Sequence, residues 1–376
     1  MSESRPQVRQ DLDNHPYDAP SPDREAASKQ HMDKPTRPSL SADIMTPDSS
    51  TEPIPIVIGL SGPSSSGKTT LARLLRDAYK PNAYILHQDD FYYTDEQIPY
   101  RNFNDRPRIQ DWDCEEAIDW LQLRKTLEHI HQRGRIPPDH SSKEDTNSVG
   151  QVDVSSATLS RLREQAQKFL HDAQTALKKP AGAFNVFIID GFLLFPPQLK
   201  EPVCGYFHRS LFLRADYATV KRRREARTGY ATLEGFWEDP PGYVDDVVWP
   251  NYVRYHRRLC VDGNVGKAPD SGVCGRLRIE VQPESAMASM DETLLWADKS
   301  LREAIGLQLA QSGGLHGLRE QARLNPGSEL RRLVETTEAK FGSDGSRPPL
   351  TIDGDPQVAF GSLPPSLMSP SEPFHR

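Results

Sequence analysis

The chain has few cysteines, no long apolar run and no strong excess of either charge. Its cysteines (Cys114, Cys204, Cys260 and Cys274) are widely spaced and form no CxxC pair, which argues against a zinc site or a disulfide framework. No apolar run approaches the roughly 18 residues of a membrane-spanning helix, so we expect no contact with a membrane. A net charge of −7 argues against a general nucleic-acid surface, because binding a phosphate backbone requires a basic field.

Both ends of the chain are poor in aliphatic clusters and rich in proline, serine and acidic residues. Such segments bury too little apolar surface to offset the entropy lost on ordering. We therefore expect disordered tails over residues 1–51 and 311–376, whose protein partners the sequence does not identify. Residues 52–310 are enough for a single α/β domain with a core of its own.

Between the tails, apolar segments of two kinds alternate. Helical spacing of apolar residues begins at Lys68, and the run over 184–189 is continuously apolar, as in a parallel strand that is covered on both faces. The alternation predicts a parallel sheet with helices on both sides. The predicted strands cover residues 54–60, 83–86, 184–189, 210–213 and 277–281, and the predicted helices cover 68–78, 115–133, 158–178, 218–227, 244–259 and 291–305.

A glycine-rich segment lies between the first predicted strand and the first predicted helix. Gly62 to Thr69 fits the pattern G-x-x-x-x-G-K-[ST], in which glycines let successive backbone N–H groups point at phosphate oxygens. The helix that follows adds the positive end of its dipole. Lys68 would bridge the β- and γ-phosphates, and Thr69 would offer its hydroxyl to Mg²⁺. The predicted phosphate-binding residues are Gly62, Ser64, Ser65, Ser66, Gly67, Lys68, Thr69 and Thr70.

Three aspartates follow predicted strands or precede a predicted helix, where ligands of α/β sheets gather. Asp190 directly follows an apolar strand and is the expected metal-side carboxylate, because a buried aspartate is costly without a partner. Asp89 is our candidate for the group that accepts the proton of an attacking hydroxyl. From spacing alone, Asp89 can equally be a helix cap or a turn residue. Asp113 precedes a predicted helix.

The segment Lys221 to Arg227 holds five cations in seven residues. On a helix, Arg223 and Arg227 share one face and Arg224 lies beside it. A solvated face or a nuclear-localisation run is the common explanation of such a pattern. The position after the strand 210–213 instead favours a lid whose guanidinium groups close on a triphosphate. Without a signal peptide ahead of the domain we expect a cytoplasmic protein, and the basic run leaves a nuclear location open.

Taken together, these motifs are similar to those of the nicotinamide riboside kinases, in particular a fungal member of that family. The match extends over roughly residues 54–308, and its Gly-Phe-Leu-Leu-Phe and Val-Trp-Pro segments are more specific than the phosphate loop. The segments that carry the resemblance, in order, are Gly59–Thr70, Gln88–Phe91, Asp111–Asp113, Asp190–Phe195, Lys221–Arg224 and Pro241–Pro250.

The resemblance implies a P-loop nucleoside monophosphate kinase-like fold with a five-stranded parallel sheet. It implies ATP as phosphate donor, Mg²⁺ as cofactor and a small nucleoside as acceptor. Asp89 would accept the proton and lie near the metal, together with Thr69 and Asp190. Arg223 and Arg227 would bind ATP. The acceptor would contact Asp89, Asp90, Phe91, Tyr92, Trp112, Asp113, Arg224 and Tyr230.

The chemistry of Trp112 and its neighbours supports this substrate independently. The ring of nicotinamide riboside carries a fixed positive charge, which an aromatic face attracts and nearby carboxylates stabilise further. Trp112 stands between Asp111 and Asp113. The alternative is an aspartate at a helix start beside a tryptophan of the core.

Two segments depart from the family pattern. Residues 228–240 are longer than expected within the predicted lid region, 217–243, so that Phe236 or Trp237 could replace Tyr230 as the second stacking aromatic. Residues 131–183 form an enlarged insertion with a helix. The adenine-binding loop is expected after the strand 277–281, without assigned residues.

Two other functions remain open at this stage. A uridine or cytidine kinase would share the fold and the chemistry but bind a neutral pyrimidine. A catalytically silent nucleotide-binding adaptor would act through the tails, although it would have no need for Lys68, Thr69, Asp89 and Asp190 together.

Overall fold

The structure is a computed structural model, and it describes the part of the chain that contains the predicted domain. The expected N-terminal tail lies outside the described residues. The described ranges are 52–102, 108–143, 152–178, 182–197, 199, 202–227, 229–231, 235–311, 315–324 and 331–336.

Within these ranges, five parallel strands form one sheet with the order β2-β5-β1-β6-β9. The register pairs Leu60 with Asp190 and His87 with the same Asp190, so the carboxyl ends of β2, β5 and β1 meet at one edge of the sheet. The predicted α/β fold with a five-stranded parallel sheet is confirmed. The strands are β1 (Ile54–Ser61), β2 (Ala83–His87), β5 (Phe184–Gly191), β6 (Arg209–Phe212) and β9 (Ile279–Val281).

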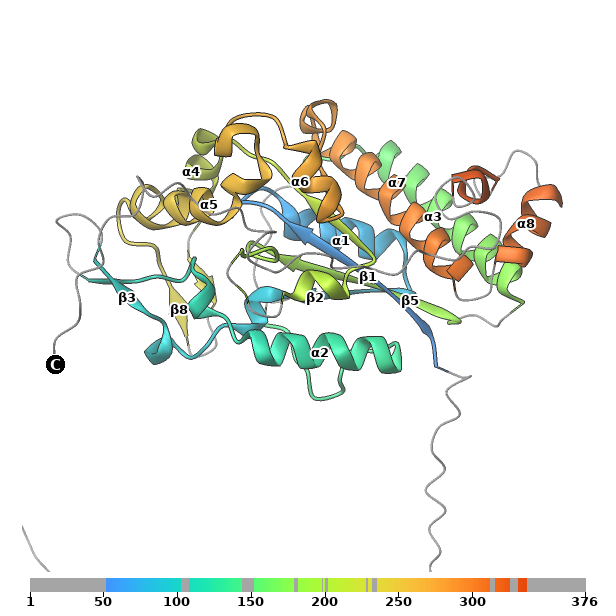
Figure 1. Cartoon of the computed structure of the whole chain (residues 1–376), viewed down its shortest axis with the longest axis horizontal. Helices are drawn as coiled ribbons and strands as arrows, with labels where there is room; N and C mark the ends of the chain where they lie inside the picture. The colour runs from blue at the N-terminus through green and yellow to red at the C-terminus, as the bar shows by residue number, and fades with distance from the viewer. Residues whose placement is uncertain are drawn as a thin grey trace, which may run out of the picture. The chain divides into compact units, whose positions relative to one another are not determined.

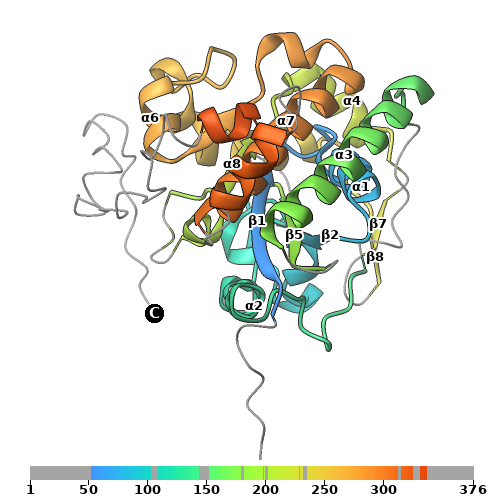
Figure 2. The same ribbon diagram turned by 90° about the vertical axis from the view of Figure 1, so that its right-hand side faces the viewer.

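Alternate residues of each strand face opposite layers, as the pleat requires. On one side, Ile56 and Ile58 of β1 pack with α1 (Lys68–Ala78), α3 (Ser156–Leu177) and α7 (Met290–Leu309). On the other side, Val57 of β1 packs with α2 (Trp120–Arg133) and with the region of α5 (Trp249–His256) and α6 (Ser271–Arg276). Figures 1 and 2 show α2 and α3 on opposite sides of the sheet. Both faces are therefore covered, which explains why β5 is buried along its whole length.

The lid and its neighbours consist of short elements, several of which come directly after the carboxyl ends of β2, β6 and β9. They are the 3-10 turns η1 (Gln88–Phe91), η2 (Asp95–Gln97) and η3 (Glu115–Ala117), the hairpin β3 (Tyr100–Arg101) with β4 (Ile109–Gln110), the turn η5 (Val203–Tyr206), α4 (Tyr217–Glu225), the hairpin β7 (Tyr230–Ala231) with β8 (Phe236–Trp237), the π-helical η6 (Val244–Val248), and the turns η7 (Arg257–Leu259), η8 (Val261–Gly263) and η9 (Glu284–Met287).

Two predicted helices begin differently from the expectation. The helix expected from residue 115 starts as a 3-10 turn and becomes α-helical only after Asp119, whose side chain accepts from the Gln122 N–H at 2.9 Å. Asp119 is a strong N-cap and sets the start of α2 there. The helix expected from residue 244 opens with the wider turn η6 before α5.

Ordered structure continues beyond residue 310, inside the segment expected to be a tail. Helix α8 (Leu315–Leu324) places Leu318 in the core, where it is 2% exposed, and Leu333 and Val334 join the same cluster. A side chain at Gly317 would collide with the Ala176 carbonyl of α3, so α8 and α3 cross closely. Mostly polar residues separate these few apolar positions, which is why composition alone suggested a tail. Among the described residues, no helix is long and apolar enough to span a membrane.

Candidate active site

The loop between β1 and α1 has a backbone that its glycines make possible. Gly62 has φ of 148° and a side chain there would lie 2.6 Å from the Leu213 carbonyl oxygen. Gly67 has φ of 100°, in the left-handed range that favours glycine, and α1 begins immediately after it. The helix therefore directs its free N–H groups and the positive end of its dipole into the loop, as an anion site requires.

Lys68 is the first residue of α1, and its side chain reaches back to the phosphate loop. Its ammonium group donates to the Pro63 carbonyl at 3.0 Å, and the residue is only 8% exposed. Burial lowers the pKa of Lys68, while the carboxylates of Asp190 and Asp89 oppose that shift. The cation is thus surrounded by protein groups of opposite charge, within the loop that is shaped for phosphate.

Asp190 ends β5 next to the phosphate loop. Its Oδ2 accepts the Thr69 hydroxyl at 2.6 Å and lies 3.1 Å from His87 Nδ1. Burial alone would raise the pKa of Asp190, but the hydrogen bond and charge of His87, with Lys68 and Thr69, hold that pKa below its ordinary value. Asp190 is therefore a carboxylate at neutral pH, as predicted from its position after a buried strand.

Several buried oxygen atoms around Asp190 have no hydrogen-bond partner within the described residues. They are Asp190 Oδ1 and the hydroxyls of Ser65 and Ser66. No group of three histidine, cysteine or acidic side chains occurs in the described ranges that could hold a metal alone. An ion here would take most ligands from water and phosphate, and Thr69 with Asp190 would supply hard oxygens; this suits Mg²⁺.

Asp89 lies in η1, directly after β2, and is half-buried. Its charge acts on Lys68 from one side and on Tyr92 from the other. Burial raises the pKa of Tyr92 well above its ordinary value, and the charges of Asp89 and Asp113 raise it further. The structure therefore brings Asp89, Asp113, Lys68 and Tyr92 into one electrostatic environment.

The other two predicted members of this segment are directed elsewhere. Asp90 accepts the Lys143 backbone N–H at 2.9 Å, and its side chain is 3% exposed. Phe91 is buried in the core cluster beneath the sheet. Of the segment predicted to line the substrate pocket, Asp89 and Tyr92 therefore face the other candidate residues, whereas Asp90 and Phe91 support the segment from behind.

Arg224 of α4 connects the phosphate loop with the acceptor side. Its guanidinium group contacts both oxygens of Asp113 at 3.3 Å, donates to Asp239 at 2.7 Å and to the Ser64 hydroxyl at 2.7 Å. Burial alone would lower the pKa of Arg224, but Asp113 and Asp239 raise it well above the ordinary value. We refer to Arg224, Asp113 and Asp239 as the arginine clasp.

Aromatic side chains from three segments surround the clasp. Trp112 is 5% exposed, and its ring centroid lies 5.3 Å from that of Tyr92 and 5.6 Å from that of Trp237. Tyr243 continues the cluster, 5.8 Å from Trp237, with the guanidinium of Arg224 over its ring. The Trp112 indole N–H has no partner within the described residues.

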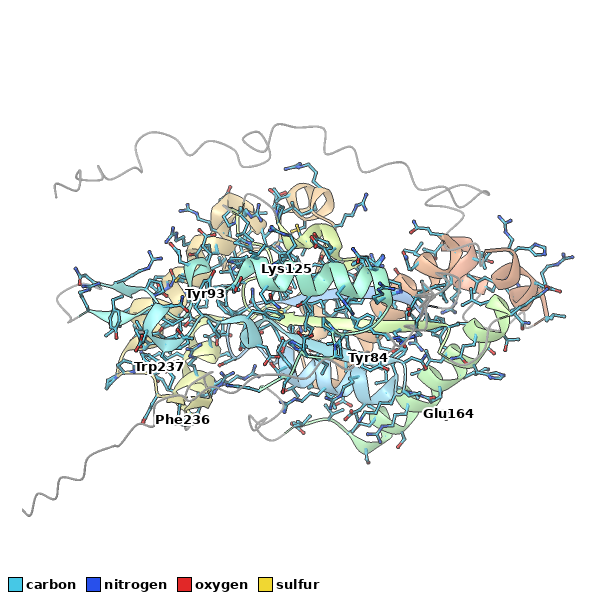
Figure 3. The ribbon with its side chains drawn as sticks, turned by 90° about the horizontal axis from the view of Figure 1, so that it is seen from below. Tyr84, Tyr93, Lys125, Glu164, Phe236 and Trp237 are labelled. Atoms are coloured by element: carbon cyan, nitrogen blue, oxygen red, sulfur yellow. The ribbon has the colours of Figure 1, made fainter. Side chains whose placement is uncertain are left out.

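A described aromatic side chain of the lid hairpin lies close to Trp112. Trp237 points to the cluster and donates to Asp239 at 2.9 Å, whereas Phe236 is 64% exposed. Figure 3 shows both in the same region as Tyr93. Tyr230 pairs with Trp237 through the backbone, and its side chain lies outside the described part of the structure. Among the described side chains of the hairpin, Trp237, an alternative in the sequence analysis, is therefore the aromatic in contact with Trp112.

Asp111 is fully buried and fixes the backbone beside Trp112. Its Oδ1 accepts from Asn251 Nδ2 at 2.8 Å and from the Asp113 N–H at 3.1 Å, and Oδ2 lies 2.9 Å from Arg101 Nε. Burial raises the pKa of Asp111 to about 6, aided by the charge of Asp113 and opposed by Asn251 and Arg101. Sequence reasoning did not find this network, because its partners come from distant segments.

The rest of the basic helix divides its cations between several partners. Arg223 donates to the Ser65 carbonyl in the phosphate loop at 3.2 Å. Arg227 acts electrostatically on Lys68 and Asp113. Lys221 instead forms an ion pair with Asp245 at 2.6 Å, outside the site. Arg223 and Arg227 therefore join Arg224 at the candidate site, whereas Lys221 anchors the helix.

Two hollows open near the loop. The first, between the phosphate loop and α5, is lined by Pro63, Ser64, Asp113, Phe192, Leu193, Val248, Tyr252, Tyr255 and His256. The second follows the ends of β6 and β9 and is lined by Arg214, Gly266, Ala268, Glu284, Met287 and Ala288. Glu284, Met287 and Ala288 of this lining follow β9 along the chain. Sequence reasoning assigned no role to Asp239, Tyr243 or His256, although Tyr243 lies in the segment Pro241–Pro250 that carries the resemblance.

The parallel sheet, the phosphate loop at the carboxyl end of β1 and the arginine-bearing lid define a P-loop kinase. A scan of the chain against models of protein families finds no match. Comparison with curated proteins gives nicotinamide riboside kinase of Schizosaccharomyces pombe, 36% identical over 251 residues, which cover 66% of this chain and 97% of that protein.

Two more distant relatives carry related names. Nicotinamide riboside kinase of Saccharomyces cerevisiae is 33% identical over 56% of this chain and 81% of its own length. Nicotinamide riboside kinase 1 of Homo sapiens is 28% identical over 54% of this chain and 77% of its own length. The chain belongs to the nicotinamide riboside kinase family, and the resemblance found in the sequence is confirmed.

Proposed function

We propose that this chain catalyses the ATP-dependent phosphorylation of the 5′-hydroxyl of nicotinamide riboside to nicotinamide mononucleotide, a step of NAD salvage. Family membership supports the reaction, and one observation in the site supports the substrate. The aromatic cluster of Trp112, Tyr92 and Trp237 adjoins the carboxylates of Asp113 and Asp89. Aromatic faces beside carboxylates favour a flat ring with a fixed positive charge.

The nucleotide end consists of the phosphate loop, Lys68 and two arginines of the lid. Backbone N–H groups of residues 62–70 would bind the β- and γ-phosphates, with Lys68 between them. Arg223 already reaches the loop at Ser65, and Arg227 acts on Lys68. The adenine would occupy the second hollow, where Arg214 and Glu284 are the charged groups.

The proposed metal site joins Thr69 and Asp190, with Asp89 nearby. The Oδ1 atom of Asp190 is buried without a partner in the described part of the chain, and it is the oxygen that an ion would take. When bound, Mg²⁺ neutralises charge on the transferred phosphoryl group. His87 holds the other oxygen of Asp190, so the carboxylate keeps its orientation.

The acceptor end would orient the riboside and remove its proton. The 5′-oxygen forms a bond to the γ-phosphorus, the bond from that phosphorus to the bridging oxygen of ADP breaks, and the hydroxyl proton passes to Asp89. Asp113 and Arg224 would hold ring hydroxyls of the sugar, with Tyr230 and the Asp90–Phe91 segment as further expected contacts. Tyr92 and Trp112 would flank the pyridinium.

A panel of acceptors tests the proposal directly. Purified protein with Mg·ATP is assayed on nicotinamide riboside, uridine and cytidine, and Lys68→Ala, which removes the phosphate-loop cation, controls for contaminating kinases. We expect nicotinamide riboside to have the highest kcat/KM. A preference for uridine would replace the substrate but keep the reaction, and nucleotide binding without any turnover would instead indicate an adaptor.

A further inference from the structure

His256 is the last residue of α5 and is buried between two aromatic rings. It is 2% exposed, and its ring centroid lies 5.0 Å from that of Tyr252 and 5.2 Å from that of Phe212. It also lines the first hollow, together with Ser64 and Asp113. No step of the proposed reaction described above uses this imidazole.

The hydrogen bonding of His256 fixes which of its nitrogens carries a proton. Nδ1 lies 3.0 Å from the Tyr252 carbonyl oxygen, which can only accept, so Nδ1 carries the hydrogen and Nε2 presents a lone pair. Burial lowers the pKa of His256 to about 3, with the charges of Arg258 and Lys68 acting in the same direction. The ring is therefore a neutral acceptor under working conditions.

Nε2 of His256 is buried and has no hydrogen-bond partner within the described part of the chain. A buried acceptor without a donor is costly, and in native structures such an atom calls for a ligand or a trapped water. The hollow is also lined by the Asp113 carboxylate, a second acceptor, and by the hydroxyl-bearing residues Ser64, Tyr252 and Tyr255. A group that pairs with both Nε2 and Asp113 must therefore bring hydrogen-bond donors.

Resting on the proposed function, we infer that His256 binds the acceptor riboside, its Nε2 accepting a hydrogen bond from a ring hydroxyl of the ribose. A ribose has two neighbouring hydroxyls, which would supply one donor to Asp113 and one to His256. His256 would then be a substrate-binding residue that selects for the intact ribose. A deoxyriboside would leave Nε2 unpaired, and sites built around a substrate hydroxyl reject analogues that lack it.

The test compares substrates that differ by one hydroxyl. We would measure kcat/KM of wild type and of His256→Phe, which keeps the ring packing, on nicotinamide riboside and on its 2′-deoxy and 3′-deoxy analogues. The substitution should lower kcat/KM for the riboside about 10- to 100-fold. For one deoxy analogue it should change kcat/KM by less than about 3-fold, because the pair is already broken. His256→Gln, which reaches a similar position with an amide, should recover part of the loss.

Phe212→Leu serves as the matched control, since Phe212 packs against the His256 ring but does not line the first hollow. It should change kcat/KM for all three ribosides by the same factor. The melting temperature and the binding of Mg·ATP show whether each variant folds. If His256→Phe lowers kcat/KM equally for all three substrates, His256 contributes only packing. If kcat/KM does not fall, Nε2 is satisfied by water. Absent wild-type turnover of nicotinamide riboside would refute the proposed function instead.

Discussion

The two ends of the candidate site are built differently. At the nucleotide end, backbone conformation forms the binding surface, and Asp190 Oδ1 with the Ser65 and Ser66 hydroxyls has no partner in the described residues. At the acceptor end, side chains satisfy one another: Arg224 is bound to Asp113 and Asp239. The nucleotide end thus offers its polar groups to a ligand, whereas the charged groups of the acceptor end pair with one another and leave the Trp112 indole N–H and His256 Nε2 without a partner among the described residues.

Because of this difference, we expect the two substrates to require different amounts of rearrangement in the site when they bind. A triphosphate can enter a loop whose N–H groups and lysine are already placed, so little rearrangement is required. In the proposed binding mode a riboside would have to exchange contacts, because Arg224 and Asp113 pair with each other and its ring hydroxyls would replace that pairing. We therefore expect substitutions near the phosphate loop to reduce kcat, and substitutions in the arginine clasp to act mainly on the KM of the acceptor.

The largest effect is expected at Asp89, which lies between the two ends. Asp89→Asn keeps the size of the side chain but removes the proton acceptor, and kcat should fall at least ~100-fold, as for other positioned bases. Binding of ATP should persist, because the phosphate loop is intact. Steady-state kinetics with calorimetry of nucleotide binding measure both quantities.

Asp90→Asn is the matched control, since Asp90 bonds to the Lys143 backbone rather than facing Lys68. Its kcat should fall by less than about 10-fold, within the contribution of a supporting hydrogen bond. An equal fall in kcat for the two variants, or full turnover by Asp89→Asn, would show that Asp89 is not the base. The proposed difference between the two ends would then no longer hold.

The contrast between the two ends also explains which parts of the fold and the site could be predicted from the sequence. The phosphate loop, the strands and Asp190 follow from local rules: glycine spacing, apolar runs and a carboxylate after a buried strand. Trp237 and Asp239 do not, because the lid segment holds several aromatics and its fold depends on Arg224, which lies at a distance in sequence. The packing of α8 on α3 could not be predicted from the sequence for a related reason. It depends on the surface of α3 and on only a few apolar residues of α8.

A smaller effect is expected from exchanging the lid arginines for lysine. Arg224→Lys loses the planar group that bonds to two carboxylates at once, so the KM for nicotinamide riboside should rise about 10- to 100-fold. The matched Arg223→Lys removes a single contact to Ser65 and should raise the KM for ATP by about 3-fold, with little change for the riboside. Initial-rate matrices in both substrates separate the two constants. A reversed pattern would exchange the proposed partners of the arginines.

The last prediction concerns the stability of the acceptor end. Burial raises the pKa of Asp111 to about 6, above the 3.8 of an ordinary aspartate, so the folded chain binds this proton more tightly than the unfolded chain. The stabilisation is complete below pH ~4 and is lost as pH rises through ~6, which amounts to at most about 3 kcal/mol. Asp111→Asn cannot titrate, so the unfolding free energy of wild type should decline relative to this variant across that window, as urea denaturation at several pH values would measure. A difference that stays constant with pH would mean that Arg101 and Asn251 fully compensate the buried charge. The Asp111 network, which fixes the backbone beside Trp112, would then be as fully paired as the arginine clasp. The riboside would in that case bind in a rigid rather than an adjustable pocket.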